Sequence, residues 1–406
     1  MTAITDERPD ESFRLSQLIY DTRYRSITIQ VIALVLVLLG IGWLINNARV
    51  NLAAAGNDLS FRFLWQTAGY DINQTLIDYN SQMTHGRATI VGLLNTLLVA
   101  FMGCVTATVI GIIMGVLRLS PNFIVKRLAA VYVEGFRNVP TLLWIIIVMA
   151  VMTEIPPAPR AFRGEDAEAT MWFFDTVAFT NRGVYVPRPV FGDGSGVVFA
   201  VFLASILAIF GFRRYARKRQ EATGQILPVF WVSLALFFIP AILAEIVMGG
   251  PLSWELPELA GFNFDGGIHM RNSLIALWLA LSLYTGAFIA ENVRAGILAV
   301  AKGQTEAAAS LGLRPNRIMS LVILPQALRV IVPPMISQYL NITKNSSLAI
   351  AIGYMDLTGT LGNITRNQTG REMESVLLLM AIYVTISLSI SAVGNWYNKS
   401  VKLKER

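Results

Sequence analysis

The chain has 406 residues, of which 54% are hydrophobic and only 15% are charged, and its mean hydropathy is +0.55. This composition lies outside the range of ordinary water-soluble proteins and predicts a membrane protein. The net charge of +7 comes from loops between apolar runs, with no basic stripe interleaved with exposed aromatics, so we expect no nucleic-acid partner. The single cysteine, Cys104, excludes an internal disulfide and a thiolate metal site, and we expect no bound metal.

Eight apolar runs approach the ~20 residues that an α-helix needs to cross a bilayer. They lie at about 27–45, 88–117, 128–152, 197–212, 226–248, 272–292, 329–352 and 375–396. We therefore expect an all-α polytopic membrane protein with about eight transmembrane helices in contact with the lipid bilayer.

Positively charged residues are unevenly divided between the two sides that these spans define. If the N-terminus is cytoplasmic, 21 of the 33 Lys and Arg residues fall in cytoplasmic segments and 10 in outer segments. This bias obeys the positive-inside rule, so we place both termini, the basic tail 397–406 and the segment 293–329 in the cytoplasm. Residues 1–87 then comprise a cytoplasmic tail, a retained first transmembrane helix that is longer than the apolar part of a signal peptide, and an outer loop.

The segment 154–196, between the third and fourth runs, faces outward in this topology. It contains five prolines and five glycines together with scattered charges. Such a composition favours an ordered but irregular loop, and we expect one short helix near Ala167–Phe179.

Two pairs of oppositely charged residues lie toward the cytoplasmic ends of predicted spans. Glu134 and Arg137 are three residues apart in the third run, and Glu291 and Arg294 repeat this spacing at the end of the sixth. Side chains at this spacing meet on a helix, so each couple is expected to form an ion pair. The pairs either make arginine tolerable at the membrane edge or take part in gating.

The cytoplasmic segment 304–325, QTEAAASLGLRPNRIMSLVILP, has the pattern of a helix, a tight turn and a second helix. Thr305 is a suitable N-cap, and Glu306 in the first turn would complement the helix dipole. Gly312 permits the left-handed residue that ends a helix, and Pro315 is favoured at the start of the next one.

Consecutive polar residues interrupt the seventh run. They are Lys344, Asn345, Ser346 and Ser347. Because four such residues cannot share one helix face, we expect an interrupted helix that lines a water-filled cavity. Snorkelling of Lys344 toward the outer surface is the alternative. In the sixth run, a rise of ~1.5 Å per residue puts Thr285 a little past the bilayer midplane.

The segment 304–325 resembles the signature loop of ABC-importer permease subunits. Glu306-Ala307-Ala308 is followed at the family's spacing by Gly312 and then by Leu324-Pro325, and the one departure is Val322 in a position where the family has Ile. The resemblance implies that the short helix docks into a groove on an ATPase subunit. Alanines with little bulk would allow that close approach.

Further segments resemble the polar amino-acid permeases of the histidine, glutamate, glutamine and arginine type. They are GLLNTLLVAFMGCVTATVIGIIMGVLRLS at 92–120, YVEGFRNVPTLL at 132–143, SLYTGAFIAENVRAGI at 282–297 and TKNSSLAIAIGYMDL at 343–357. The resemblance implies a permease domain at 88–396, with an extra outer loop and two helices inserted at about 154–270. This long layout resembles the "general L-amino acid" permease subunit.

The resemblance further implies a type I ABC-importer transmembrane domain in the bacterial inner membrane. It implies import of L-amino acids, of broad range, from a periplasmic binding protein by a heterodimer with a homologous permease and two ATPase subunits. We expect no cofactor and no catalytic residue in this chain, because it has no phosphate-binding loop; ATP and Mg²⁺ belong to the partner subunits.

Within such a protein, Lys344, Asn345 and Ser347 are candidates for binding the substrate carboxylate, with Thr285 on the opposing wall. An ion-coupled secondary amino-acid transporter is the alternative function. The exact amino-acid range, the permease of the pair that holds the substrate, and the role of 154–196 stay open.

Overall fold

The computed structural model describes residues 22–54, 59–164 and 167–401. Seven helices in these ranges are long and apolar enough to cross a membrane, and a bent helix pair raises the number to eight if it counts as one span. The long helices are α2 (Thr22–Ala54), α3 (His85–Leu117), α4 (Phe123–Asn138), α5 (Thr141–Glu154), α6 (Ser195–Thr223), α7 (Val229–Val247), α8 (Asn272–Leu298), α11 (Leu324–Asn345) and α13 (Glu372–Val401). The expected helical, polytopic architecture is confirmed.

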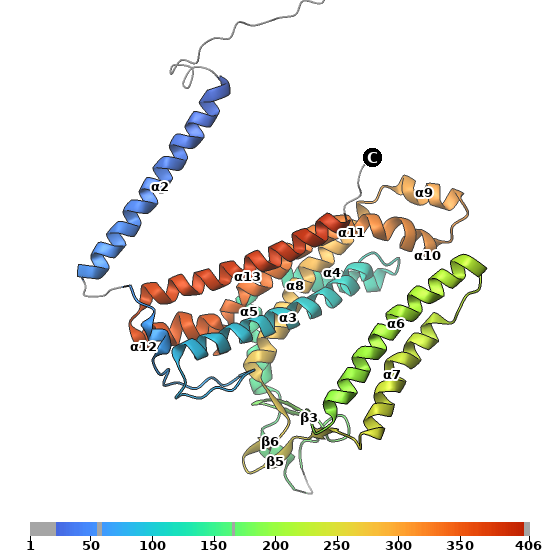
Figure 1. Cartoon of the computed structure of the whole chain (residues 1–406), viewed down its shortest axis with the longest axis horizontal. Coiled ribbons are helices and arrows are strands. Elements are labelled where there is room, and N and C mark those ends of the chain that lie inside the picture. Colours follow the sequence, from blue (N-terminus) through green and yellow to red (C-terminus); the bar gives the residue numbers. More distant parts are fainter. Residues whose placement is uncertain (1–21, 55–58, 165–166, 402–406) are drawn as a thin grey trace, which may run out of the picture.

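Helices α3 and α8 lie side by side at the centre of the fold, and α4, α5 and α11 pack around α8 (Figure 1). Glycines bring the two central helices close together. A Cβ atom at Gly111 would lie 2.5 Å from Cβ of Ile289, and one at Gly115 would lie 2.7 Å from the carbonyl oxygen of Ala290. Since apolar contact gives little drive for association in lipid, such close backbone approach supplies the packing that holds these spans together.

The third apolar run does not form the single continuous span that we expected at 128–152. Helix α4 ends at Asn138, and α5 begins at Thr141 with its axis turned by 109°. Pro140 explains the break, because its ring disfavours helical backbone at the preceding Val139, which is extended (φ −114°, ψ 134°). The bend directs α4 along α3 and α8, while α5 packs on α8 and leads toward the outer side.

The segments before α6 and after α7 form short antiparallel strands on the side opposite to α9 (Lys302–Ser310) (Figure 1). These strands are β1 (Ala178–Thr180), β2 (Gly183–Val186), β3 (Arg188–Phe191), β4 (Leu252–Glu255), β5 (Glu258–Ala260), β6 (Asn263–Asp265) and β7 (Ile268–Arg271). They pair as β1-β2-β7, β3-β4 and β5-β6. Because β2 pairs with β7 and β3 pairs with β4, the chain returns after α7 to the two sheets from which it departed before α6. An ion pair between Arg188 and Glu255 joins β3 to β4.

The short helix expected near Ala167–Phe179 is absent from the described part of that segment. Phe173, Phe174 and Asp175 have positive φ values of 52–59°, a left-handed conformation that cannot continue a right-handed helix. The residues after them enter β1, where Phe179 lies opposite Val184 of β2. Pairing of β1 with β2 in a tight hairpin, and of β2 with the distant β7, therefore takes the place of the expected helix.

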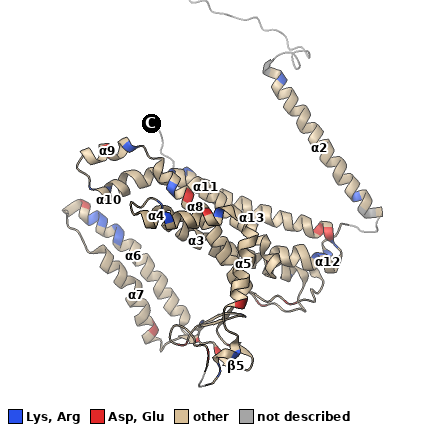
Figure 2. Cartoon of the chain, turned by 180° about the vertical axis from the view of Figure 1, so that it is seen from behind, with Lys and Arg blue, Asp and Glu red and all other residues tan. Residues whose placement is uncertain are grey.

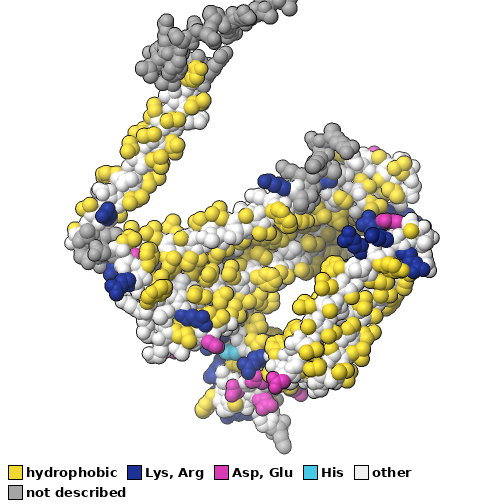
Figure 3. Space-filling view, viewed as in Figure 1, with side chains coloured by type: hydrophobic (Ala, Val, Ile, Leu, Met, Phe, Trp, Pro, Cys, Tyr) yellow, Lys and Arg dark blue, Asp and Glu magenta, His cyan; other side chains and the backbone are white. Residues whose placement is uncertain are grey.

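Two apolar elements stand away from the central helices. The apolar window of α2 is 0% buried, and those of α6 and α7 are 11% and 6% buried. Helices α6 and α7 pack mainly on each other, and Figure 3 shows an open space between this hairpin and the rest of the molecule. Exposed apolar surface of this kind is what a span presents to lipid or to another membrane chain.

Candidate functional site

The cytoplasmic loop forms two short helices joined by a left-handed turn. Helix α9 ends in a Schellman arrangement: the N–H of Gly312 donates to the Ala309 carbonyl (2.9 Å), and the N–H of Leu313 donates to the Ala308 carbonyl (3.3 Å). Gly312 has a φ of +76°, so the turn requires the conformation that glycine adopts without strain. Pro315 is the first residue of α10 (Pro315–Ile318), as expected from its position.

The start of α9 differs from the sequence expectation. The helix begins at Lys302 with Ala301 before it, so Thr305 is not its N-cap and Glu306 lies in the second turn. Glu306 therefore does not stabilise the first turn of α9. Its side chain is exposed, as are those of Ala307 and Leu311, and Leu311 is 80% exposed.

Only Ala308 of the expected coupling residues in α9 is buried, at 6% exposure, where the helix rests on the rest of the loop. A short π-helical turn η3 (Met319–Ile323) then leads into α11, which begins with the exposed residues Leu324 and Pro325. The loop thus presents the small side chains of α9 together with several large apolar side chains, of which Leu311 and Leu321 are the most exposed, at the extremity of the molecule (Figure 1).

Charged residues form a network that joins the inner ends of α3 and α8 to the C-terminal part of α4. Glu291 accepts hydrogen bonds from Arg118 and from Arg294 (2.5 Å), and Arg137 lies 4.0 Å from the same carboxylate. The expected Glu291–Arg294 pair is therefore present. The expected pair between Glu134 and Arg137 is not, because Glu134 contacts Arg118 instead, at 3.5 Å.

Three helices meet through this network, with Glu291 at its centre. Arg118 lies just after α3 and joins a glutamate of α4 to one of α8. No local pattern indicates this role of Arg118, since Arg118 and Glu291 are 173 positions apart in the chain. Packing of α3 on α8 creates the contact.

The polar run in the seventh span changes the helix from α to 3₁₀ without leaving a gap, so the break that we expected is only a change of helix type. Helix α11 ends at Asn345 and a 3₁₀ helix, η4 (Ser346–Ile352), follows it. Lys344 and Ser347 line a cavity of about 390 Å³, together with Tyr383 and Ser387 of α13. Asn345 is half-buried and outside this lining, and Thr285 is only 2% exposed within the packing of α8. The structure therefore brings two of the four substrate-path candidates together.

Asp356 lies beyond η4 and is completely buried. Its Oδ1 accepts the N–H of Gly359 (2.8 Å), and its Oδ2 accepts the hydroxyl of Tyr383 (3.2 Å). These bonds tie the segment before η5 (Thr358–Thr365) to α13. The carboxylate has hydrogen-bond donors on both oxygens, which favours a structural role.

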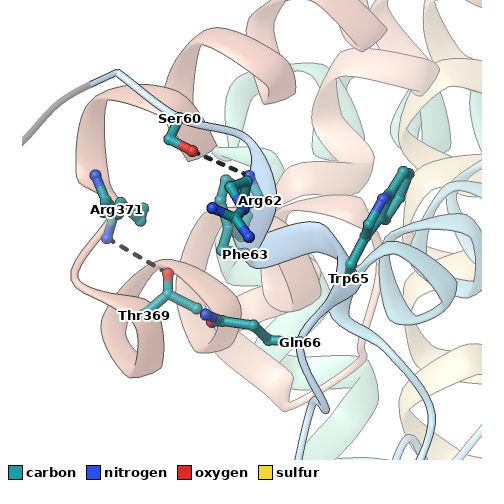
Figure 4. Close-up of a pocket in the computed structure, with 7 residues that line it drawn as sticks. All are labelled: Ser60, Arg62, Phe63, Trp65, Gln66, Thr369 and Arg371. Atoms are coloured by element: carbon teal, nitrogen blue, oxygen red, sulfur yellow. Dashed lines mark hydrogen bonds between the residues drawn. The ribbon is translucent and has the colours of Figure 1, made fainter.

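A second cavity, of about 660 Å³, opens on the outer side where η1 (Arg62–Trp65) meets the turn between α12 (Arg366–Thr369) and α13 (Figure 4). It is lined by Ser60, Arg62, Phe63, Trp65, Gln66, Thr369 and Arg371. Nearby, Glu374 accepts the N–H of Ser60 (3.1 Å) and a guanidinium N–H of Arg371 (3.3 Å). The sequence did not point to this contact, which fixes the segment after α2 on the outer end of α13.

Comparisons with known proteins identify relatives of the chain. Residues 196–403 match the family model described as "Binding-protein-dependent transport system inner membrane component". The chain is 54% identical, over 100% of both chains, to the glutamate/glutamine/aspartate/asparagine transport system permease protein BztB of Rhodobacter capsulatus. It is 42% identical, over 97% of this chain and 96% of the relative, to the general L-amino acid transport system permease protein AapQ of Rhizobium johnstonii.

A solved amino acid ABC transporter, crystallised with histidines, is similar at a TM-score of 0.45 and 20% identity, over 78% of this chain and 95% of that one. The family model covers just over half of the chain, and the two relatives align over nearly all of it. The chain therefore belongs to the family of binding-protein-dependent transport system inner membrane components.

Proposed function

We propose that this chain is a permease subunit of an ATP-driven ABC importer that moves L-amino acids from a periplasmic binding protein into the cytoplasm. The observation that carries the proposal is the exposed α9–Gly312–α10 loop, on the side opposite to the strands, in a member of this family. The names of BztB and AapQ support amino acids as the substrate class.

The proposed coupling surface is the exposed face of α9. Ala307 leaves room for the backbone of another protein, Glu306 beside it offers a carboxylate, and the side chain of Leu311 supplies an apolar anchor. An ATPase subunit seated there would push or pull on α8 and α11, because the loop joins the inner ends of these two helices. ATP and Mg²⁺ would be bound by that partner.

Two glycines in this loop give a matched test of the coupling role. A Cβ atom at Gly303 or Gly312 would meet nothing within 4 Å, but only Gly312 has a positive φ. We expect Gly312→Val to lower ATP-driven uptake at least tenfold, since valine at this φ costs about 1–2 kcal/mol and displaces the end of α9. Gly303→Val should leave uptake within about twofold. Uptake and membrane insertion are measured in vesicles that contain the assembled transporter, and equal uptake by the two variants would contradict the coupling role.

The proposed assembly contains a homologous permease, two ATPase subunits and the binding protein. The apolar window of α13 is 0% buried in this chain, which leaves a full helix face for a second permease or for lipid. A heterodimer in which the two permeases share one translocation path would bury part of that face of α13. The alternative function, an ion-coupled transporter, has less support. The carboxylate of Glu291 is already paired with Arg118 and Arg294 and is therefore not available to bind a coupling ion.

We also propose that the Glu291 network holds the inner ends of α3 and α8 and the C-terminal part of α4 together during the transport cycle. Replacement of Glu291 by Gln removes the charge shared by three arginines and is expected to lower the free energy of unfolding by about 1.5–3 kcal/mol. Glu134→Gln is the control: this side chain is 56% exposed and its contact is 3.5 Å long, so a change below about 1 kcal/mol is expected. Thermal unfolding in detergent measures both, and equal losses would argue against Glu291 as the centre of the network.

Lys344 and Ser347 are proposed to contact the carboxylate that all amino acids share. Lys344→Met should then weaken uptake of every substrate by a similar factor, about tenfold to a hundredfold, because a charge-assisted hydrogen bond is lost. Lys399→Met, near the cytoplasmic end of α13, is the charge-matched control and should have little effect. Uptake assays with several amino acids test this role. Normal transport by Lys344→Met would contradict substrate binding and would favour a Lys344 side chain that only reaches toward the membrane surface.

A further inference from the structure

The inner end of the α6–α7 hairpin combines an apolar groove with a dense basic cluster. The groove, of about 350 Å³, lies between the two helices and is apolar apart from Arg213 and Ser233. Phe210 and Phe237 belong to its lining. The Nε of Arg213 donates to Oγ of Ser233 (3.4 Å), which holds the guanidinium at the edge of the groove.

Helix lengths place this groove at the inner boundary of the bilayer. Helix α7 has 19 residues, which matches the ~30 Å apolar thickness at ~1.5 Å per residue. Helix α6 has 29 residues and therefore continues past the membrane. Arg213 lies eighteen residues after Ser195, about 27 Å along the helix, so its side chain reaches the level of the headgroups.

The part of α6 that leaves the membrane carries positive charge on one face. Arg213 and Arg217 are four residues apart, and so are Arg214 and Lys218, so the four side chains form two neighbouring columns. Figure 2 shows this blue cluster at the free end of α6. Among the described residues, the only carboxylate bridge here joins Arg217 to Glu221 (3.1 Å), which leaves the other cations without an acidic partner.

We propose that the inner end of the α6–α7 hairpin binds an anionic phospholipid, with its phosphate on Arg213 and Arg214 and an acyl chain in the groove. Charge complementarity favours this occupant, since juxtamembrane basic clusters attract anionic headgroups and basic pockets between spans bind them.

The test uses the full-length chain, purified in a neutral detergent and stripped of lipid. Native mass spectrometry and thermal unfolding are measured with phosphatidylglycerol, phosphatidylcholine or soluble glycerol 3-phosphate added. We expect phosphatidylglycerol to remain bound and to raise the unfolding temperature, and the other two to do neither. Equal effects of phosphatidylcholine, or of glycerol 3-phosphate, would overturn the proposal in favour of an apolar filler or a simple phosphate site.

Variants locate the site. The double variant Arg213→Gln/Arg214→Gln should weaken phosphatidylglycerol binding at least tenfold, and Leu234→Trp should do the same by filling the groove while all charges remain. The matched control is Lys126→Gln/Arg127→Gln, an exposed basic pair near the inner end of α4, which should retain binding. Equal losses in the two double variants would mean that net charge alone attracts the lipid and would overturn the site.

A final measurement on the assembled transporter tests whether lipid or a partner protein occupies the groove between α6 and α7. If the bound phosphatidylglycerol persists in the complex, the groove is a lipid site in the working protein. Its complete displacement by a partner permease would assign the groove to a subunit interface and contradict the proposal. None of these readouts depends on transport.

Discussion

Close packing of α3 against α8 is the contact on which the rest of the fold depends. Gly111 and Gly115 let the two backbones approach, so that Ile289 and Ala290 fill the space a side chain would need. The Glu291 network forms where this seam reaches the inner side, because the seam brings Arg118 beside α8. The cytoplasmic loop then starts from the same end of α8. A displacement of the loop would therefore be transmitted along a stiff, closely packed pair of helices.

Much of this architecture follows from local sequence patterns. Apolar runs locate the spans because lipid forces each backbone polar group to bond within its own helix. Gly312 and Pro315 mark the turn in the cytoplasmic loop, since each residue type is suited to one backbone conformation. The change from α to 3₁₀ helix after Asn345 falls within a run of polar side chains that no single helix face can hold. In each case a few neighbouring residues are enough to determine the local structure.

Other features depend on contacts that join distant parts of the chain, and a single sequence does not reveal them. Glu134 is bonded to Arg118 and not to Arg137, because the bend at Pro140 and the packing of α4 place another arginine within reach. Two strand pairs of the outer region, β2–β7 and β3–β4, form across the whole α6–α7 hairpin. Pro140 did carry a signal for the bend, but the apolar residues on both sides of it resemble one continuous span.

Energy source is the property that separates an ABC importer from an ion-coupled transporter most directly. The measurement is amino-acid uptake by vesicles that contain this chain with its partner permease, ATPase subunits and binding protein. With ATP on the cytoplasmic side, uptake should continue after an ionophore collapses the ion gradients, and it should stop when ATP is withheld. Uptake that stops with the ionophore while ATP remains high would contradict the account.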